Sequence, residues 1–284
     1  NLDLEKTDAG GFFPAGTEIV IHAAALAYDW GSLDLFKRVN TEVTEKLLRF
    51  SQESGCRQFI YISSISVHGF GNHVETTEEG PYYPLINPYQ VSKKAAEEAV
   101  LAADSPAFDT AVIRPGNVYG PGDTTTFFPI FEAMERGIMG YIGKGGSLTC
   151  PVYVTDLTEA VAACIGCPAA KAQIFNITGG EKTTWEMLLN LAAEKLGIKP
   201  PRIHLPVFLA KAAAGFLEGI FSLVKAKNAP ALTHYRVDML VHNYHFSIAK
   251  AANLLGYAPK IMWPEGIALT AEDYRKLHKP HAGV

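Results

Sequence analysis

A serine at the end of an apolar run and a tyrosine–lysine pair further along constrain this chain more than any other feature. Residues 59–62 (Phe-Ile-Tyr-Ile) favour β structure and are followed by two serines, the second of them Ser64, which predicts a buried strand. Pro88 comes just before an Ala- and Glu-rich stretch, which predicts the start of a helix. Tyr89 and Lys93, four residues apart, would share one face of that helix. Ligands of open α/β sheets bind at the carboxyl ends of the strands, where such a serine and such a helix face can meet.

The three side chains together suit proton transfer to an oxygen atom. A free tyrosine has a pKa of about 10, which makes it a poor proton shuttle at neutral pH. An ammonium within a few ångströms favours the phenolate and lowers that pKa toward the working range. The serine hydroxyl can then hold a carbonyl or alcohol oxygen beside the phenol while a hydride moves to or from a nicotinamide. A tyrosine and a lysine at this spacing also occur by chance in many helices, so the pair alone is weak evidence.

Three motifs in a fixed order give the sequence its resemblance to a known family. They are residues 60–69 (IYISSISVHG), 87–93 (NPYQVSK) and 113–122 (IRPGNVYGPG). The chain resembles the extended short-chain dehydrogenase/reductase family, which includes nucleotide-sugar epimerases and dehydratases and 3β-hydroxysteroid dehydrogenases. The resemblance implies an enzyme that uses NAD or NADP. It also implies an α/β fold, a Rossmann-type doubly wound parallel sheet with a smaller, mostly helical C-terminal substrate domain.

The resemblance further implies roles for single residues. Ser64, Tyr89 and Lys93 become the catalytic trio, and Ser64 is preferred to Ser63 because it stands three residues before Val67. The implied cofactor-binding residues are Asp3, Leu4, Ala23, Ala24, Ala25, Asn40, Ile62, Ser63, Tyr89, Lys93, Pro115, Gly116 and Val118. The implied substrate contacts are Ser66, His68 and Asn117, and no metal site is expected. The family usually has tyrosine where this chain has His68, a departure that bears on the substrate rather than on hydride transfer.

Length, charge and cysteine content limit the class of protein. The chain has 284 residues, a formal net charge of -4 and four cysteines. This length suits one large α/β domain, or a large domain with a smaller one. The negative charge, without a visible basic stripe, argues against a nucleic-acid partner and leaves a small-molecule substrate. The few scattered cysteines suit a reducing cytoplasm rather than a disulfide scaffold.

The most apolar stretch of the chain, residues 206–224, is interrupted by Lys211 and Glu218. We therefore expect no stable membrane insertion. A helix packed on its neighbours is the preferred interpretation, ahead of a membrane-surface segment. An apolar lid over a lipid-like substrate is compatible with the packed helix.

The predicted domain organisation is a dinucleotide-binding domain at 1–178 and a substrate domain at 179–284, with contributions from about 119–150. Dinucleotide-binding folds begin with a strand and a glycine-rich turn, and neither is found before the strand predicted at 18–22. We therefore expect roughly fifty further residues before Asn1. By resemblance, the helices expected at 34–54 and 89–103 form the interface of a homodimer.

Three local expectations concern the surroundings of the site. Residues 67–88, rich in glycine, proline and acidic residues, predict a long loop over the active site. Asp156 is expected to cap the helix that follows it. His22, at the end of the first strand, is expected to be structural rather than an acid or base.

The substrate class depends on charge near the site. Nucleotide-sugar enzymes of the family hold a diphosphate with an arginine, but this chain has Thr149 there, and no Arg or Lys lies between Lys144 and Asp156. Residues 29–31 and 206–224 resemble bacterial members of the 3β-hydroxysteroid dehydrogenase group. We favour a secondary alcohol or ketone on an apolar, steroid-like or long-acyl molecule. A nucleotide-sugar epimerase or dehydratase is the alternative. A non-catalytic cofactor sensor is a third hypothesis, which the intact trio opposes.

Overall fold

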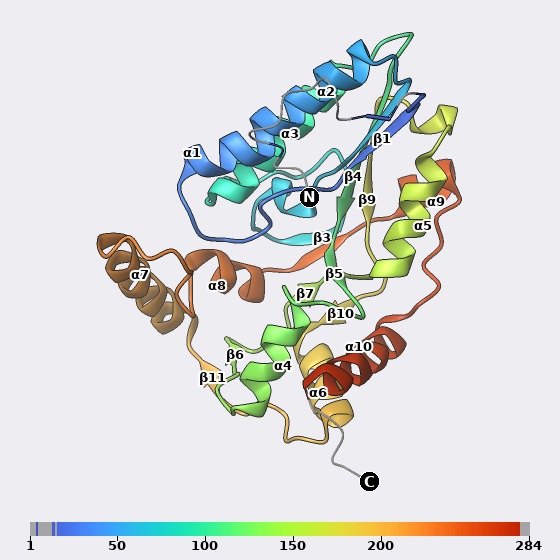
Figure 1. Cartoon of the computed structure of the whole chain (residues 1–284). Helices are drawn as coiled ribbons and strands as arrows, with labels where there is room; N and C mark the ends of the chain where they lie inside the picture. The colour runs from blue at the N-terminus through green and yellow to red at the C-terminus, as the bar shows by residue number, and fades with distance from the viewer. Residues whose placement is uncertain (1–3, 5–12, 15, 279–284) are drawn as a thin grey trace.

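Four parallel strands form the central sheet of the computed structural model, which describes residues 4, 13–14 and 16–278 (Figure 1). The strands are β1 (Ile19–His22), β2 (Gln58–Ile62), β4 (Asp109–Pro115) and β9 (Gln173–Ile177), hydrogen-bonded in the order β1-β2-β4-β9. The middle strands are buried along almost their whole length, and their apolar residues Phe59, Ile60, Val112 and Ile113 are fully buried. Continuous burial of this kind is typical of a parallel sheet that is covered on both faces.

Helices cover both faces of the sheet, as a doubly wound fold requires. Helices α2 (Val43–Glu53) and α3 (Pro88–Ala102) lie on one face, and α5 (Val154–Cys164) and α9 (Ala249–Leu255) lie on the other (Figure 1). Each face has its own apolar core: Phe59 and Val112 pack toward α2 and α3, whereas Ile60 and Ile113 pack toward α5 and α9. The predicted α/β fold class is confirmed.

The long helix predicted at 34–54 is continuous but not uniform. It begins as α1 (Leu33–Phe36), widens into the π-helical segment η2 (Lys37–Glu42) and continues as α2. Asn40, one of the implied cofactor-binding residues, lies in the π-helical segment. Short π-helical segments inside α-helices frequently occur at functional sites.

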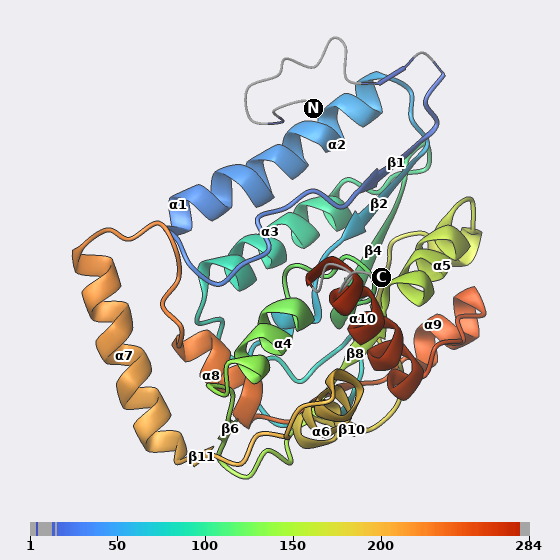
Figure 2. The same ribbon diagram turned by 60° about the horizontal axis from the view of Figure 1, so that its bottom comes forward.

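A further apolar core lies beyond the carboxyl ends of the sheet strands. It is built from α4 (Phe127–Glu135), α6 (Trp185–Leu196) and α10 (Trp263–His278), which Figures 1 and 2 show side by side. Short strands border it: β5 (Asn117–Tyr119), β6 (Tyr141–Ile142), β7 (Leu148–Thr149), β8 (Pro151–Tyr153), β10 (Thr183–Thr184) and β11 (His204–Leu205). Residues from about 119–150 therefore pack with the C-terminal part of the chain.

The C-terminal part also returns to the sheet. Strand β12 (Tyr244–Phe246) pairs in parallel with β3 (His73–Thr76), and α9 packs against β9 and the short helix η4 (Pro168–Ala170). The long loop expected at 67–88 thus contains a paired strand, which local sequence could not reveal because its partner is distant in the chain. The capping prediction for Asp156 was wrong. Tyr153 is the N-cap of α5, and Asp156 is buried and accepts hydrogen bonds from the backbone N–H groups of Lys260 (3.0 Å) and Ile261 (3.2 Å).

The apolar stretch at 206–224 forms helix α7 (Val207–Leu223), which is followed by α8 (His234–Val241). Only one face of α7 is packed: Ala210 and Ala214 are buried, whereas Phe208 and Phe216 are 72% and 69% exposed. Figure 2 shows α7 at the edge of the molecule, next to α8. Within the described part of the chain, every helix is too short or too polar to cross a bilayer.

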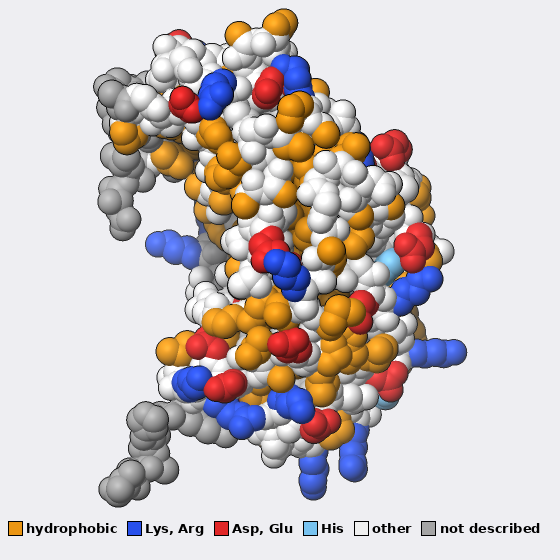
Figure 3. All heavy atoms as spheres, turned by 90° about the vertical axis from the view of Figure 1, so that its right-hand side faces the viewer, with side chains coloured by type: hydrophobic (Ala, Val, Ile, Leu, Met, Phe, Trp, Pro, Cys, Tyr) orange, Lys and Arg blue, Asp and Glu red, His pale blue; other side chains and the backbone are white. Residues whose placement is uncertain are grey.

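The face of the molecule that includes α5, α9 and α10 carries charges of both signs. In Figure 3, lysine and arginine side chains lie among aspartate and glutamate side chains and between apolar patches. The cationic side chains on this face are therefore interspersed rather than gathered into one basic stripe.

Candidate active site

The end of strand β2 presents Ser64 at the carboxyl edge of the sheet. Ser63, directly after the strand, is buried, and Ser64 is the N-cap of the short helix η3 (Ile65–His68). The Ser64 hydroxyl oxygen accepts a hydrogen bond from the backbone N–H of Ser66 at 3.1 Å. The predicted strand with its terminal serines is confirmed, and the cap fixes the direction of the Ser64 side chain.

The N-terminus of α3 fixes Tyr89 opposite this strand end. Asn87 is the N-cap, and its side-chain oxygen accepts from the backbone N–H of Tyr89 at 2.8 Å. The side chain of Gln90 completes a capping box by accepting from the backbone N–H of Asn87 at 3.2 Å. Pro88 takes the first helical position, where its missing N–H costs nothing. The helix start predicted from the sequence is confirmed.

The Ser64 hydroxyl lies close enough to the Tyr89 phenol to influence its pKa. Burial raises the pKa of the Tyr89 phenol, and the nearby Ser64 hydroxyl opposes this rise. The net direction is upward, so the lowered pKa expected for this tyrosine is not found. Lys93 Nζ is instead bonded to the Ile62 carbonyl oxygen.

Lys93 is buried and points back toward the end of β2. Its Nζ donates a hydrogen bond to the Ile62 carbonyl oxygen at 2.6 Å and lies 4.4 Å from the centre of the Tyr61 ring. Burial lowers the pKa of Lys93 to about 7, and the charge of Glu97 opposes that shift. Lys93 therefore lies at the end of β2, one helical turn beyond Tyr89. Because its pKa is about 7, its charge depends on the groups around it.

Beneath the serine pair lies a buried ion pair that the sequence analysis did not identify. The Glu97 carboxylate accepts hydrogen bonds from Ser63 Oγ at 3.0 Å and from Arg114 Nε at 2.9 Å, and both charged side chains are fully buried. Burial raises the pKa of Glu97, but hydrogen bonds and charge from Arg114 outweigh it and leave the pKa lowered. The one available signal was the spacing of Glu97, four residues after Lys93 on the same helix.

His68 does not have the position expected of a substrate contact. Its side chain is fully buried and stacks on Tyr82, with ring centres 4.5 Å apart. Its Nδ1 lies 3.3 Å from the Pro81 carbonyl oxygen, and its Nε2 lies 2.9 Å from Arg114 Nη1. Burial and the charge of Arg114 lower the pKa of His68 to about 3, so the ring is neutral. Both ring nitrogens have protein partners, and we no longer assign this residue to the substrate.

The other two predicted substrate contacts lie beside the serine end of the site. Ser66 follows Ser64 in η3 and is buried. Asn117 is partly buried, and its side-chain nitrogen donates to Thr149 Oγ1 at 3.0 Å. Thr149 stands where nucleotide-sugar enzymes of the family have an arginine. The neutral side chains of Thr149 and Asn117 are therefore found at this position instead of a cation.

The residues predicted to hold the dinucleotide follow strand β1. Ala23 and Ala24 are exposed and Ala25 is partly buried, which leaves the carboxyl end of β1 open to a ligand. Asn40 fixes the chain just beyond: its side-chain oxygen accepts from Leu26 N–H at 2.8 Å, and its nitrogen donates to the Leu26 carbonyl oxygen at 3.1 Å. Asn40 Nδ2 also lies 3.0 Å from Ser92 Oγ, so this one side chain joins the loop after β1 to helix α3.

Two further predictions at the N-terminal side have different outcomes. Asp3 lies outside the described residues, whereas Leu4 is described and its carbonyl oxygen accepts from Lys46 Nζ at 3.4 Å. His22 is buried, and its Nε2 lies 3.0 Å from Thr44 Oγ1. Burial, assisted by the charge of Lys93, lowers the pKa of His22 to about 4, which fits the structural role expected for it.

The end of β4 requires glycine at position 116. A β-carbon there would lie 2.1 Å from the Cys150 carbonyl oxygen, a contact that backbone atoms cannot relieve without moving. Pro115 ends the strand and is buried, and Val118 packs with the core behind it. Gly116 thereby lets the two segments that flank the site approach each other closely.

These residues fit the nicotinamide side of a dinucleotide. Small side chains leave the end of β1 open, and a buried lysine and a buried tyrosine hydroxyl converge at the end of β2. Among the described residues, no group of three or more His, Cys, Asp or Glu side chains is arranged to hold a metal ion.

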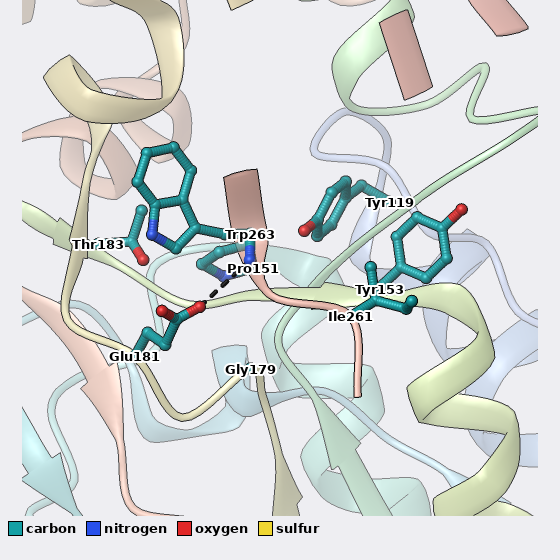
Figure 4. Close-up of a pocket in the computed structure, with 8 residues that line it drawn as sticks. All are labelled: Tyr119, Pro151, Tyr153, Gly179, Glu181, Thr183, Ile261 and Trp263. Carbon is teal, nitrogen blue, oxygen red and sulfur yellow. Dashed lines mark hydrogen bonds between the residues drawn. The ribbon is translucent and has the colours of Figure 1, made fainter. Parts of the chain in front are cut away.

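A small hollow lies on the other side of β8, away from the predicted catalytic residues. Figure 4 shows that Tyr119, Tyr153, Glu181 and Trp263 surround it together with Pro151, Gly179, Thr183 and Ile261. The Glu181 carboxylate accepts from the backbone N–H of Trp263 at 3.2 Å. None of the residues predicted to bind cofactor or substrate lines this hollow.

Comparison with known families decides the class of the protein. The family model described as "NAD dependent epimerase/dehydratase family" matches residues 1–178. The chain belongs to this family. It is therefore an NAD(P)-dependent enzyme of the extended short-chain dehydrogenase type.

Relatives of this epimerase/dehydratase family member act on different substrates. A 2-alkyl-3-oxoalkanoate reductase of Stenotrophomonas maltophilia (strain K279a) is 27% identical over 93% of this chain and 83% of its own length. Isoform 1 of the 3beta-hydroxysteroid-dehydrogenase/decarboxylase of Arabidopsis thaliana is 31% identical over 92% of this chain and 63% of its own length. The structure of UDP-glucuronic acid 4-epimerase from Bacillus cereus in complex with NAD has a TM-score of 0.77 at 20% identity, covering 99% of this chain and 80% of that one. The last likeness concerns the fold alone.

Proposed function

We propose that this family member interconverts a secondary alcohol and a ketone on an apolar molecule, steroid-like or with a long acyl chain. The observation that carries the proposal is the approach of the Ser64 hydroxyl to the Tyr89 phenol at the carboxyl end of the sheet. Two hydroxyl groups held this close can both contact one substrate oxygen. A nicotinamide bound beside them supplies or accepts the hydride.

Each residue of the trio then has a separate task. Ser64 donates a hydrogen bond to the carbonyl oxygen and holds it beside the phenol. Tyr89 gives its proton to that oxygen in reduction and takes the proton back in oxidation. Lys93, whose Nζ is bonded to the Ile62 carbonyl oxygen, would hold the ribose side of the cofactor and favour the phenolate when its ammonium is charged.

The remaining cofactor contacts are proposed from their positions around the same edge. Ala23, Ala24 and Ala25 would lie along the dinucleotide, and Asn40 would keep their loop in place. Pro115, Gly116 and Val118 would border the nicotinamide from the end of β4, with Ile62 and Ser63 opposite. The two-domain division and the homodimer formed through the helices at 34–54 and 89–103 remain predictions.

The charges near the site support an apolar substrate over a nucleotide sugar. A diphosphate needs cationic side chains, and Arg is the best bidentate partner. Thr149 is buried and neutral, and it accepts a hydrogen bond from Asn117. Arg114 is already paired with Glu97. Two of the relatives, by their names, act on an oxoalkanoate and on hydroxysteroids, which agrees with this preference.

A screen that follows nicotinamide absorbance tests the proposal. The protein is incubated with NAD, NADP or their reduced forms and with three classes of probe: a hydroxysteroid, a long-chain 3-oxo ester and UDP-glucose. Absorbance changes with the steroid or the oxo ester alone are the expected result. An epimerase or dehydratase returns its hydride and leaves no net absorbance change, so conversion of UDP-glucose is followed separately by chromatography. Conversion of UDP-glucose alone would favour the nucleotide-sugar alternative, and no reaction of the steroid or the oxo ester would contradict the proposal.

A further inference from the structure

A second tyrosine, Tyr235 of α8, lies next to Tyr89, although no sequence motif pointed to it. Asp29 joins the starts of the two helices that carry these tyrosines. Its carbonyl oxygen accepts from the side chain of Asn87, the N-cap of α3, at 2.8 Å, and its carboxylate accepts from Thr233, the N-cap of α8, at 2.6 Å. Each tyrosine stands two residues after its cap, so the shared aspartate brings the two first turns together.

The surroundings of Tyr235 include residues of the segment that follows Ser64. Its ring packs edge-on against Phe70, with ring centres 4.9 Å apart. Its phenol also lies close to the Ser66 hydroxyl, although the geometry falls short of a full hydrogen bond. Ser66 Oγ is buried and has no hydrogen-bond partner among the described residues. Burial raises the pKa of Tyr235, and the nearby Tyr89 and Asp29 raise it further, so the phenol keeps its proton and can donate.

The two arginines near this region are already paired. Arg236 donates to the Asp29 carboxylate at 2.9 Å, and Arg114 donates to the Glu97 carboxylate at 2.9 Å. Lys93 Nζ is bonded to the Ile62 carbonyl oxygen and is assigned to the cofactor. The side chains of Ser66 and Tyr235 themselves offer neutral hydroxyl donors. Such donors suit a carbonyl or hydroxyl oxygen and would compensate a phosphate or carboxylate poorly.

We infer that Ser66 and Tyr235 together bind a second, uncharged oxygen of the substrate, on a carbon close to the one that reacts between Ser64 and Tyr89. The inference rests on the proposed function, and it narrows the substrate to apolar ketones or alcohols with a neighbouring neutral oxygen. A substrate without that oxygen would leave the buried Ser66 hydroxyl unpaired. Sites built to bind a substrate oxygen discriminate strongly against molecules that lack it.

Two heptyl ketones, one with an ester group beside the ketone and one without it, test this inference. Methyl 3-oxodecanoate carries an ester carbonyl near the ketone, and 3-decanone has the same heptyl ketone without the ester. We expect the wild-type protein to reduce the ketone of methyl 3-oxodecanoate with a higher kcat/KM than the ketone of 3-decanone. Tyr235→Phe should lower kcat/KM for the ester about tenfold, mainly through KM, and change that for 3-decanone less than twofold. Ser66→Ala should do the same, and the double variant should lose little more because the two hydroxyls share one oxygen.

Tyr257→Phe is the matched control, since its buried hydroxyl donates to the Thr178 carbonyl oxygen at 3.0 Å outside the catalytic set. This variant should leave the ratio of kcat/KM for the two ketones unchanged. If Tyr235→Phe lowers kcat/KM equally for both ketones, or for neither, the inference is overturned while the proposed function stays intact. Failure of the wild-type protein to oxidise reduced nicotinamide with either ketone would overturn the inference, and absence of turnover with the hydroxysteroid as well would overturn the proposed function.

Discussion

The carboxylate of Glu97 accepts a hydrogen bond from Ser63 Oγ at 3.0 Å, and so ties helix α3 to the strand end that carries Ser64. The same helix holds Tyr89 at its first turn. The distance between the serine and the tyrosine of the proposed mechanism therefore depends on a buried charge that touches neither reacting group. The opposite charge comes from Arg114 of β4, the strand next to β2 in the sheet.

Glu97→Gln should destabilise the protein strongly. The substitution leaves the Arg114 guanidinium buried without its counter-charge, which typically costs about 3–5 kcal/mol. Urea unfolding of both proteins measures the difference. Glu98→Gln is the matched control, because that neighbouring side chain is 65% exposed and should change the free energy of unfolding by less than about 0.5 kcal/mol. Equal effects of the two substitutions would show that the buried pair is not structural.

Tyr89→Phe should lower turnover by a factor of about a hundred or more while cofactor binding is kept. The phenyl ring preserves the edge-on contact with Phe36, where ring centres are 6.4 Å apart, so only the proton is lost. Initial rates on the substrate found by the screen and calorimetric titration with NAD or NADP measure the two properties separately. Near-normal turnover would remove Tyr89 from the mechanism.

Local patterns in the sequence were enough to predict the elements that carry the trio. The apolar run at 59–62 determines strand β2, and Asn87 with Pro88 determines where α3 begins, because caps depend on neighbours in the sequence. The order of the three motifs gave the family, and with it the parallel sheet. These features depend on residues that are close together in the chain.

The predictions that failed depend on partners that tertiary structure supplies. His68 was placed against the substrate by resemblance, but Arg114 and Tyr82 enclose its ring. The pairing of β3 with β12 and the approach of Tyr235 to Tyr89 likewise join distant segments. No periodicity or motif encodes such contacts.

Acid should destabilise the protein through His22. Its pKa lies at about 4 in the folded protein and near 6.5 when unfolded, so the unfolded chain binds the proton first as pH falls. Stability is therefore lost progressively between pH 6.5 and about 4, by at most about 3 kcal/mol for this group. His22→Gln keeps a nitrogen near Thr44 but cannot titrate, and its free energy of unfolding should fall less steeply over that range. Identical pH slopes for the two proteins in urea unfolding would contradict the assignment.

Gly116→Ala should destabilise the protein and distort the site. The new β-carbon would meet the Cys150 carbonyl oxygen at 2.1 Å, so either β4 or the segment before β8 must move. We expect a loss of about 2 kcal/mol or more in unfolding free energy and a fall in kcat/KM, because Asn117 and Pro115 would move with the strand. Gly219→Ala in α7 is the control: its β-carbon meets nothing within 4 Å, and it should stabilise the helix by about 0.5–1 kcal/mol. Thermal unfolding of the two variants separates the outcomes, since the first should melt below and the second above the wild-type protein. If Gly116→Ala unfolds at the same temperature as the wild-type protein, the end of β4 and the segment at Cys150 can move apart without loss of stability. The close approach of these two segments would then not determine the geometry of the site.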